Sequence, residues 1–170
     1  MLGVIGQQVN PDWRVLDVGC RDGGTCEWFV ARGCDDVTGI DIEDRAGDHA
    51  TKRFKFVQAA LEDYQPDHAF DVVVAMYVLP FVAGTWEDRL AHLARLTAPG
   101  SLLLCNVFAD DDGWAGRADI ATIRDEDFRA LLLRTGWQIR YQGHERYEGP
   151  TYQGRIKPWS VFGVLAERAR

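Results

Sequence analysis

A glycine-rich turn is the feature of this chain whose residue types could do chemistry. The apolar residues Val15 and Leu16 are followed by Asp17, and Gly19 and Gly23 come next within a few positions. Glycine adopts positive φ and carries no side chain, so the backbone of such a turn can press against a ligand. A helical pattern follows, whose first backbone amides would point at that ligand. The sequence therefore predicts a small-molecule site at this turn.

A second acid, Asp41, stands 22 residues after Gly19, at the end of the apolar run Val37–Ile40. In folds that bind nucleosides at a glycine turn, a carboxylate at this spacing accepts hydrogen bonds from the ribose hydroxyls. Asp41 could instead cap the residues that follow it. The turn and this acid together predict a nucleoside-containing cofactor.

Composition limits the other classes of function. The 170 residues are 46% hydrophobic, which predicts one domain, residues 1–170, with a sizeable core. A formal net charge of −7 with scattered basic residues argues against DNA or RNA as a partner. The four cysteines form no C-x-x-C pair and indicate reduced thiols in a cytoplasmic protein. The longest nearly apolar run, residues 70–83, is too short to cross a membrane.

Strands and helices are expected to alternate, which indicates a parallel sheet with helices on both faces. Thr85 and Asp88 have capping-box spacing, so a helix is expected to begin after Thr85 and to end at residues 99–100. Phe56 lies only 15 residues after Asp41, so any helix between those two strands is short or missing. The other expected helices are 25–32 and 125–135, and the expected parallel strands are 13–18, 36–41, 54–58, 70–76 and 101–108.

The last two expected strands, residues 137–143 and 159–166, flank a polar segment in which no helix is expected. Without a crossover helix, neighbouring strands run antiparallel, so these two should form a hairpin. We therefore predict a doubly wound α/β fold with strand order 3-2-1-4-5-7-6 and an antiparallel terminal strand. An all-parallel dinucleotide-binding fold would not end in this hairpin.

These motifs resemble those of the class I S-adenosylmethionine-dependent methyltransferases over nearly the whole chain. The turn from Asp17 to Gly23 resembles the family's first motif, in which a carboxylate precedes the glycines, and Asp41 matches the acid that holds the ribose. Residues 70–76 resemble the family's fourth-strand motif, and residues 96–104 its proline-glycine turn into the fifth strand. The resemblance implies S-adenosylmethionine as cofactor and methyl transfer as the reaction.

The resemblance also implies which residues contact the cofactor. The family's acid after the third strand aligns with Ala60, which leaves the adenine amine to the Leu61 backbone and to Glu62. Arg21 replaces the middle glycine of the first motif and would place a cation near the methionine end. The residues expected at the cofactor are Asp17, Gly19, Cys20, Arg21, Gly23, Asp41, Ile42, Ala60, Leu61, Glu62, Ala75 and Met76.

A narrower similarity connects the chain to the tellurite-resistance methyltransferases. It rests on residues 78–82, on residues 96–100 and on residues 154–157. That similarity implies a small soft anion as the methyl acceptor, whereas other members of the class methylate many small organic molecules. The acceptor class is therefore open at this point.

The polar segment between the last two strands is the candidate acceptor site. His144 could act as a general base, and Arg146 or Arg155 could clamp an anionic acceptor. Arginines on a terminal hairpin are also ordinary surface residues, so the alternative is a purely structural hairpin. The acids Asp110 to Asp112 after the fifth strand are expected to form a solvated loop and not a metal site.

Two other functions are compatible with part of this pattern. Arg21 and Ala60 would permit a non-catalytic protein that binds S-adenosylmethionine or S-adenosylhomocysteine. A nicotinamide-dependent oxidoreductase would share the turn and Asp41, but the third glycine of its fingerprint is missing. We therefore predict an S-adenosylmethionine-dependent methyltransferase that acts on a small molecule in the cytoplasm, without a nucleic acid, a membrane or a metal.

Overall fold

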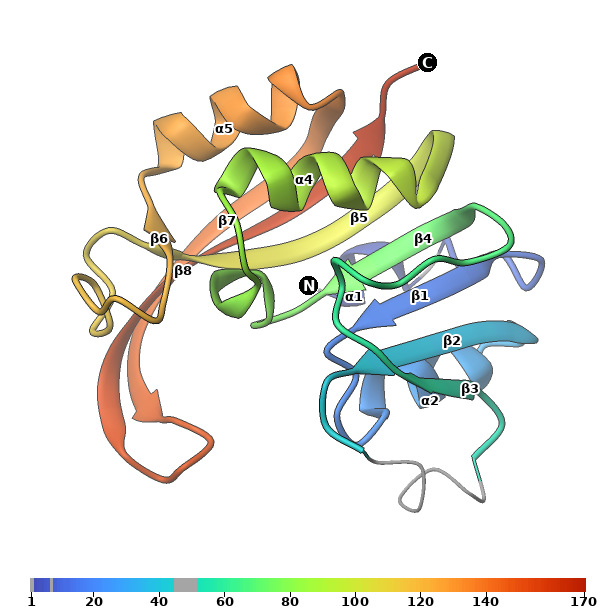
Figure 1. Ribbon diagram of the computed structural model, residues 1–170, viewed down its shortest axis with the longest axis horizontal. Helices are drawn as coiled ribbons and strands as arrows, with labels where there is room; N and C mark the ends of the chain where they lie inside the picture. Colours follow the sequence, from blue (N-terminus) through green and yellow to red (C-terminus); the bar gives the residue numbers. More distant parts are fainter. Residues whose placement is uncertain (1, 7, 45–51) are drawn as a thin grey trace.

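The centre of the fold is a mixed sheet with strand order β3-β2-β1-β4-β5-β8-β7, in which β6 pairs with β5 (Figure 1). The computed structural model describes residues 2–6, 8–44 and 52–170. The strands are β1 (Arg14–Val18), β2 (Asp36–Asp41), β3 (Lys55–Gln58), β4 (Phe70–Ala75), β5 (Thr97–Ala109), β6 (Thr122–Ile123), β7 (Trp137–Pro150) and β8 (Ile156–Arg168). Since β6 is a short addition, the order predicted for seven strands is confirmed.

Strands β1 to β5 pair with one another in parallel, whereas β8 runs antiparallel to both β5 and β7. Val18, the last residue of β1, pairs with Ile40 near the end of β2. Asp41, the last residue of β2, pairs with Gln58 at the end of β3. The carboxyl ends of these strands therefore meet at one edge of the sheet, the edge at which open α/β sheets bind ligands.

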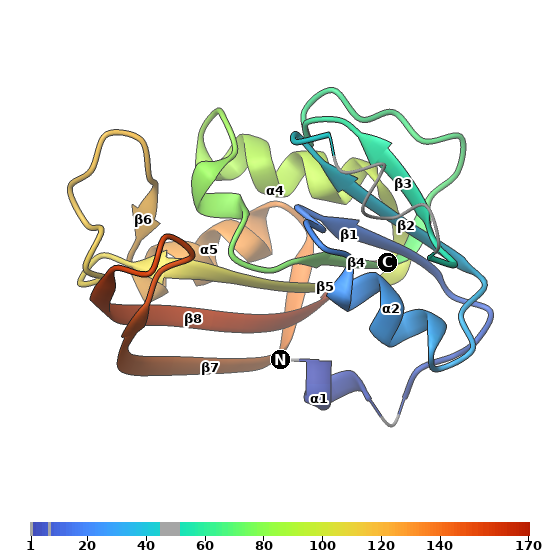
Figure 2. The ribbon, with the colours of Figure 1, turned by 90° about the horizontal axis from the view of Figure 1, so that it is seen from below.

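Helices cover both faces of the sheet (Figures 1 and 2). On one face, α4 (Trp86–Arg95) and α5 (Asp125–Arg134) bury Leu93 and Phe128 against the core that contains Val73. On the other face, α1 (Leu2–Ile5) and α2 (Gly24–Val30) bury Phe29 in the core that contains Val72. The 3-10 helix η1 (Leu79–Phe81) follows β4. Neighbouring residues of β4 thus face opposite cores, as the two-residue period of a strand requires.

The capping box expected at α4 is confirmed, but the end of that helix differs from the prediction. The Thr85 side chain accepts a hydrogen bond from the Asp88 backbone at 3.1 Å, and Asp88 Oδ2 accepts one from the Thr85 backbone at 3.0 Å. Residues 99–100 lie inside β5, which already begins at Thr97. Thr97 pairs with Phe70, and a register shift follows, so the strand continues through the Pro-Gly pair.

The terminal hairpin is confirmed as antiparallel, and it is much longer than predicted. Pairing runs from Trp137 and Arg168 to Pro150 and Ile156 with one register shift, between Ile139 and Tyr141. The polar residues expected in a turn therefore belong to strands. The paired β7 and β8 extend away from the rest of the sheet as a two-stranded arm (Figure 1). A hydrophobic pattern could not reveal this length, because the arm carries polar side chains among its aromatic ones.

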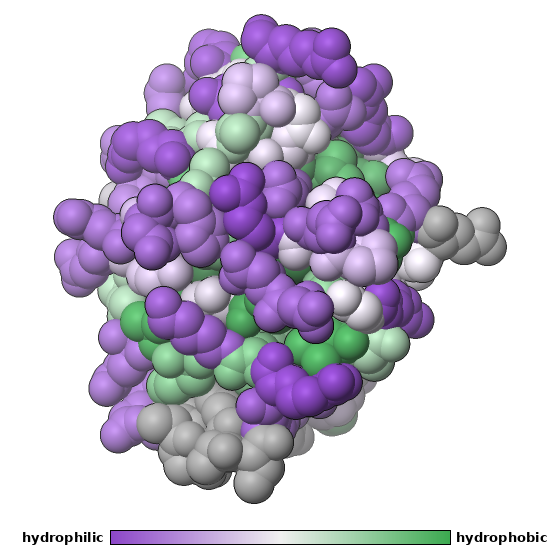
Figure 3. Space-filling model, turned by 90° about the vertical axis from the view of Figure 1, so that its right-hand side faces the viewer, coloured by the Kyte–Doolittle hydropathy of each residue, from purple (hydrophilic) through white to green (hydrophobic). Residues whose placement is uncertain are grey.

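Figure 3 views the molecule from the side at which β1 and β2 begin, opposite the carboxyl ends of these strands. This face is mostly hydrophilic, and its apolar areas are broken up by polar side chains. None of the helices in the described ranges has the length and apolar composition needed to cross a membrane. The helix expected to be short or missing between β2 and β3 falls on residues 45–51, outside the described residues.

Candidate active site

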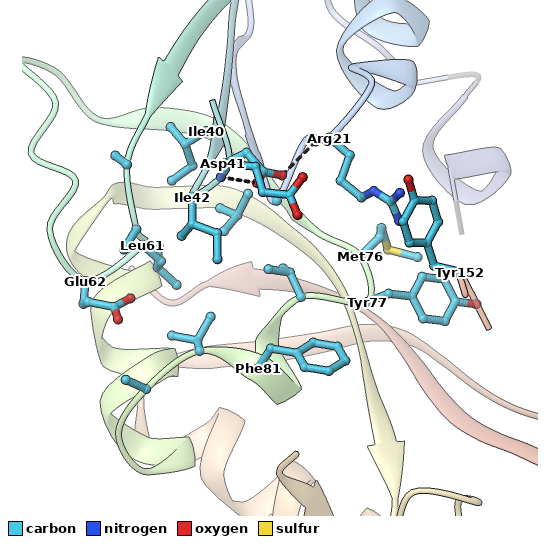
Figure 4. A pocket seen from close by; sticks show the side chains of 18 residues that line it. Arg21, Ile40, Asp41, Ile42, Leu61, Glu62, Met76, Tyr77, Phe81 and Tyr152 are labelled. Carbon is cyan, nitrogen blue, oxygen red and sulfur yellow. Dashed lines mark hydrogen bonds between the residues drawn. The ribbon is translucent and has the colours of Figure 1, made fainter. Parts of the chain in front are cut away.

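A cavity of about 540 Å³ opens at the carboxyl ends of β1, β2 and β4. Its walls come from the turn after β1, the end of β2, residues 59–62 after β3, residues 76–83 after β4, and Tyr152 between β7 and β8 (Figure 4). Strand order reverses beside β1 and β4, which is where doubly wound sheets form their ligand crevice. A cavity of this size accommodates a cofactor-sized small molecule.

Gly19 gives the turn after β1 its shape. Its φ is 71°, and a Cβ at this position would lie 2.7 Å from the Val78 Cγ2 atom. The backbone amides of Gly19 and Cys20 both donate to the Ile40 carbonyl, at 2.8 and 3.0 Å. A side chain at Gly19 would therefore push apart two walls of the cavity.

Asp41 is buried in the cavity wall, where only 7% of the residue is exposed. Its Oδ2 atom accepts a hydrogen bond from the Arg21 backbone at 3.0 Å, and its Oδ1 atom accepts one from the Glu43 backbone at 3.0 Å (Figure 4). A carboxylate offers about four lone-pair sites, so each oxygen can accept one more donor. Asp41 therefore caps the next residues and still has capacity for a pair of ribose hydroxyls.

Arg21 connects the glycine turn to the terminal hairpin. Its backbone adopts a φ of 48°, a left-handed conformation that the family's glycine would take more readily. Its guanidinium carbon lies 3.6 Å from the centroid of the Tyr152 ring, a cation–π contact (Figure 4). The only Arg or Lys among the described residues that line the cavity is thus covered by an aromatic side chain.

Eight of the twelve residues expected at the cofactor line the cavity: Gly19, Arg21, Asp41, Ile42, Ala60, Leu61, Glu62 and Met76. The exposed Ile42 and the buried Leu61 are apolar side chains beside the Asp41 carboxylate. Such a combination fits a nucleoside, because the base presents flat apolar faces and the ribose presents hydroxyl donors. The residues of this structure therefore fit the nucleoside part of S-adenosylmethionine.

The remaining four expected residues, Asp17, Cys20, Gly23 and Ala75, do not line the cavity. The buried Asp17 side chain accepts a hydrogen bond from the Cys26 thiol, with 3.6 Å between Sγ and Oδ2. Burial raises the pKa of Asp17 to about 7. Cys20 and Ala75 are buried core residues, and Gly23 caps the amino terminus of α2. These four support the cavity walls from behind.

The three residues expected to bind the acceptor also lie outside the cavity lining. His144 shares a 2.8 Å hydrogen bond between its Nε2 atom and the Ser160 hydroxyl. Arg146 donates to Asp111 Oδ2 from both Nε and Nη2, each at 3.1 Å. Arg155 is an exposed residue of the turn between β7 and β8. His144 and Arg146 are thus engaged in contacts within the hairpin and its neighbouring loop.

Alternation along β7 explains why these side chains lie outside the cavity lining. Successive residues of a strand face opposite sides of the sheet, so His144 and Arg146 share one face while Tyr147 occupies the other. The Tyr147 hydroxyl oxygen lies 3.5 Å from that of Tyr77, which lines the cavity. The tyrosine, and not the two basic residues, therefore lies on the face of β7 that adjoins the cavity.

Tyr77 is the principal residue of the cavity lining that the sequence motifs do not indicate. It directly follows the fourth-strand motif and has a φ of 57°, a conformation held by a hydrogen bond from its backbone amide to the Asn106 side chain. Burial and the contact with Tyr147 raise the pKa of the Tyr77 phenol. Backbone strain of this kind in a non-glycine residue is concentrated at functional sites. Its place after the motif was the one signal the sequence offered.

The acidic loop after β5 is solvated only in part, because Asp110 and Asp111 are exposed whereas Asp112 is not. Asp112 is buried, and it accepts hydrogen bonds from the Lys157 ammonium group and, at 2.9 Å, from the Ser160 backbone. The Lys157 Nζ atom lies 3.7 Å from the Trp159 ring centroid. Of the described residues, no group of three or more His, Cys, Asp or Glu side chains is placed to hold a metal ion.

Comparison with known proteins agrees with this geometry. Residues 5–149 match the family described as a methyltransferase domain. The chain is 31% identical over 120 residues to a sterol 24-C-methyltransferase of Gibberella zeae, covering 61% of this chain and 31% of that protein. It is 32% identical over 114 residues to a ubiquinone biosynthesis O-methyltransferase of Maricaulis maris, covering 61% of this chain and 43% of that protein. The chain thus matches less than half the length of these curated relatives.

Two solved structures show the same fold. TehB from Haemophilus influenzae superposes with a TM-score of 0.77 at 17% identity, over 97% of this chain and 60% of that one. The 1,6-didemethyltoxoflavin-N1-methyltransferase of Burkholderia thailandensis, solved with bound 1,6-didemethyltoxoflavin and S-adenosylhomocysteine, superposes with a TM-score of 0.72 at 16% identity, over 99% of this chain and 76% of that one. The domain match over most of the chain shows that the protein belongs to the methyltransferase family, and the two structures show that it shares their fold.

Proposed function

We propose that this methyltransferase transfers the methyl group of S-adenosylmethionine to a small-molecule acceptor at the mouth of the cavity. One observation carries the proposal: segments far apart in the sequence, with Gly19, Asp41, Leu61 and Met76 among them, line a single cavity at the switch point of the sheet. Cofactor contacts and an open acceptor side are thereby brought together.

The lining suggests an orientation for the cofactor. We assign the ribose to Asp41, the adenine to the side formed by Ile42, Leu61 and Glu62, and the methionine end to the turn that contains Arg21. The Arg21 guanidinium would then form a charge-assisted contact with the methionine carboxylate. In Figure 4 the adenine side and Arg21 lie on different sides of Asp41, as this assignment requires.

The protein's own contribution to the reaction is mostly positioning. S-adenosylmethionine supplies an electrophilic methyl group when it is bound. Holding a nucleophile about 3–3.5 Å from the reacting carbon, on the line of attack, supplies much of the rate enhancement available to such a displacement. Tyr77 and Phe81 line the part of the cavity away from Leu61 and Glu62, which is where an acceptor would enter (Figure 4).

The names of the related proteins support a small organic acceptor. They name a sterol, a step of ubiquinone biosynthesis and a bound 1,6-didemethyltoxoflavin. The net charge of −7 supports a small molecule over a nucleic acid. Four free, buried cysteines support a reducing, cytoplasmic location. One continuous sheet supports treating residues 1–170 as a single methyltransferase domain.

The test is calorimetric titration with S-adenosylhomocysteine, the demethylated product. Asp41→Asn should weaken binding by about 1–3 kcal/mol, the range for a hydrogen-bonding group left unsatisfied. Asp36→Asn is the matched control, since this acid lies at the opposite end of the same strand, and its affinity should equal that of the wild type. Equal affinity of Asp41→Asn would remove Asp41 from the site. Failure of the wild type to bind would contradict the proposed function.

A further inference from the structure

Exposed aromatic side chains gather at the acceptor end of the cavity. The exposed fractions are 42% for Tyr77, 50% for Phe81, 42% for Tyr147 and 79% for Tyr152. Tyr77, Phe81 and Tyr152 line the cavity, and the Tyr147 hydroxyl meets that of Tyr77. We call these four residues the aromatic rim. Contiguous exposed apolar surface on this scale marks a binding site.

Buried rings hold most of the aromatic rim in place. Tyr77 meets the Trp159 ring edge-on at 5.9 Å between centroids, and Tyr147 stacks on the same ring at 6.0 Å. Phe81 meets the buried Phe108 edge-on at 5.9 Å. Because these rings are positioned before any ligand arrives, little conformational entropy is lost when a ligand binds against them.

The charges around the cavity disfavour an anionic acceptor. Its described charged lining residues are the cation Arg21 and the acids Asp41, Glu43 and Glu62. Arg21 is covered by Tyr152 and is assigned above to the methionine carboxylate. His144 and Arg146 lie on the opposite face of β7 from the aromatic rim. Among the described lining residues, no cation is therefore left to pair with an anion at the acceptor end.

We propose that the acceptor is a neutral, planar aromatic compound with a ring hydroxyl, and that it binds against the aromatic rim. This inference rests on the proposed function. A lone pair of the hydroxyl oxygen forms the new oxygen–methyl bond, the electrons of the broken sulfur–methyl bond stay on sulfur, and the hydroxyl proton is released to bulk water. Flat rings pack well against Tyr and Phe side chains, and a neutral hydroxyl needs no cation as a partner.

The experiment compares matched probes by calorimetry on the protein saturated with S-adenosylhomocysteine. The probes are 2-naphthol, its carboxylate analogue 2-naphthoate, its saturated analogue decahydro-2-naphthol, and tellurite. We expect 2-naphthol to bind about tenfold more tightly than either analogue, since aromatic contact and charge each contribute about that factor. Tellurite should give no binding heat. With S-adenosylmethionine, mass spectrometry should detect 2-methoxynaphthalene.

Variants of the aromatic rim test whether 2-naphthol binds against it. Tyr77→Ala and Phe81→Ala should each weaken 2-naphthol binding about tenfold, and Tyr77→Phe should restore it because the ring makes the contact. S-adenosylhomocysteine affinity should stay at the wild-type value in all three. Tyr141→Ala is the matched control, because Tyr141 is an exposed β7 tyrosine outside the cavity lining.

The outcomes separate the two proposals. A wild-type protein that fails to bind S-adenosylhomocysteine contradicts the proposed function. A protein that binds it, yet binds 2-naphthoate or tellurite more tightly than 2-naphthol or does not bind 2-naphthol at all, overturns the acceptor class. Equal binding of 2-naphthol and its saturated analogue contradicts the inference that the acceptor is planar and aromatic. Equal losses for Tyr77→Ala and Tyr141→Ala overturn the placement on the aromatic rim.

Discussion

Asp17 shows how the family's first motif shapes the molecule at the scale of one residue. The acid is only 3% exposed and its hydrogen-bond partner is the Cys26 thiol, so its ionised form is poorly stabilised. Burial raises its pKa to about 7, well above the ordinary range of an aspartate. The folded protein therefore holds a proton on Asp17 at pH values where the unfolded chain has lost it.

This proton predicts how stability depends on pH. Between about pH 4 and pH 7 the folded state binds one more proton than the unfolded state, so the free energy of unfolding falls as pH rises. The loss is complete above about pH 7 and amounts to roughly 4 kcal/mol. Asp17→Asn cannot ionise and should remove this slope. Urea unfolding at several pH values from 5 to 8 measures it.

The control for Asp17→Asn is Asp12→Asn, which changes an exposed acid in the turn before β1. It should keep the wild-type slope. If Asp17→Asn also keeps that slope, the Asp17 carboxyl group is ionised in the folded protein at neutral pH, and its buried placement is wrong.

At the scale of elements, the Asp112–Lys157 pair fastens the loop after β5 to the terminal hairpin. The Asp112 side chain is fully buried and the Lys157 side chain is 7% exposed. Burial lowers the pKa of Lys157, while the hydrogen bond to Asp112 favours its charged form. The Lys157 Nζ atom also lies 4.4 Å from the Trp114 ring centroid. This pair therefore joins two elements whose aromatic residues adjoin the cavity.

Breaking the pair should destabilise the protein strongly. Lys157→Met leaves the Asp112 carboxylate buried without its cation and should lower the free energy of unfolding by about 3–5 kcal/mol. The double variant Asp112→Asn/Lys157→Met should lose less free energy of unfolding than the sum of the two single variants, because neither charge is then buried without its partner. Urea unfolding of the four proteins of this cycle provides the measurement.

Arg117→Met is the control for the pair, because it removes an ion pair with Asp119 whose side chains are 50% and 65% exposed. Its effect should stay within about 1 kcal/mol, as for other surface pairs. A comparably small loss in Lys157→Met would show that the Asp112 carboxylate is hydrated and that the pair does not fasten the hairpin.

At the scale of the whole molecule, the cavity depends on parallel strands that end at one edge. Ligand binding should therefore stabilise the entire fold. S-adenosylhomocysteine at 100 times its dissociation constant should add about 2.7 kcal/mol to the free energy of unfolding. For a chain of this length the midpoint of thermal unfolding should rise by roughly 5–10 °C. Differential scanning calorimetry checks the shift, and a nicotinamide dinucleotide at equal concentration should give none.

Much of the fold could be predicted because it follows from local patterns. The buried strands around Val15 and Val72 are apolar runs, and the capping-box spacing at Thr85 predicts the start of α4. The end of α4 could not be predicted in the same way. Pairing of Thr97 with Phe70 extends β5 backwards through a Pro-Gly pair that ends strands in most contexts, and that pairing is a tertiary contact.

By itself, the sequence determined the order of the seven main strands and of helices α2, α4 and α5, together with the glycine turn at Gly19 and the acid at Asp41, because periodicity and motif spacing are properties of neighbouring residues. It did not reveal α1, η1 or β6. Only the tertiary structure decided which side chains of the terminal hairpin face the cavity. A shift of one residue in register reverses every side chain of a strand, and this register is set by pairing with β5 and β8. Tyr147 thus meets Tyr77 at the cavity, while the polar side chains of His144 and Arg146 face away from it.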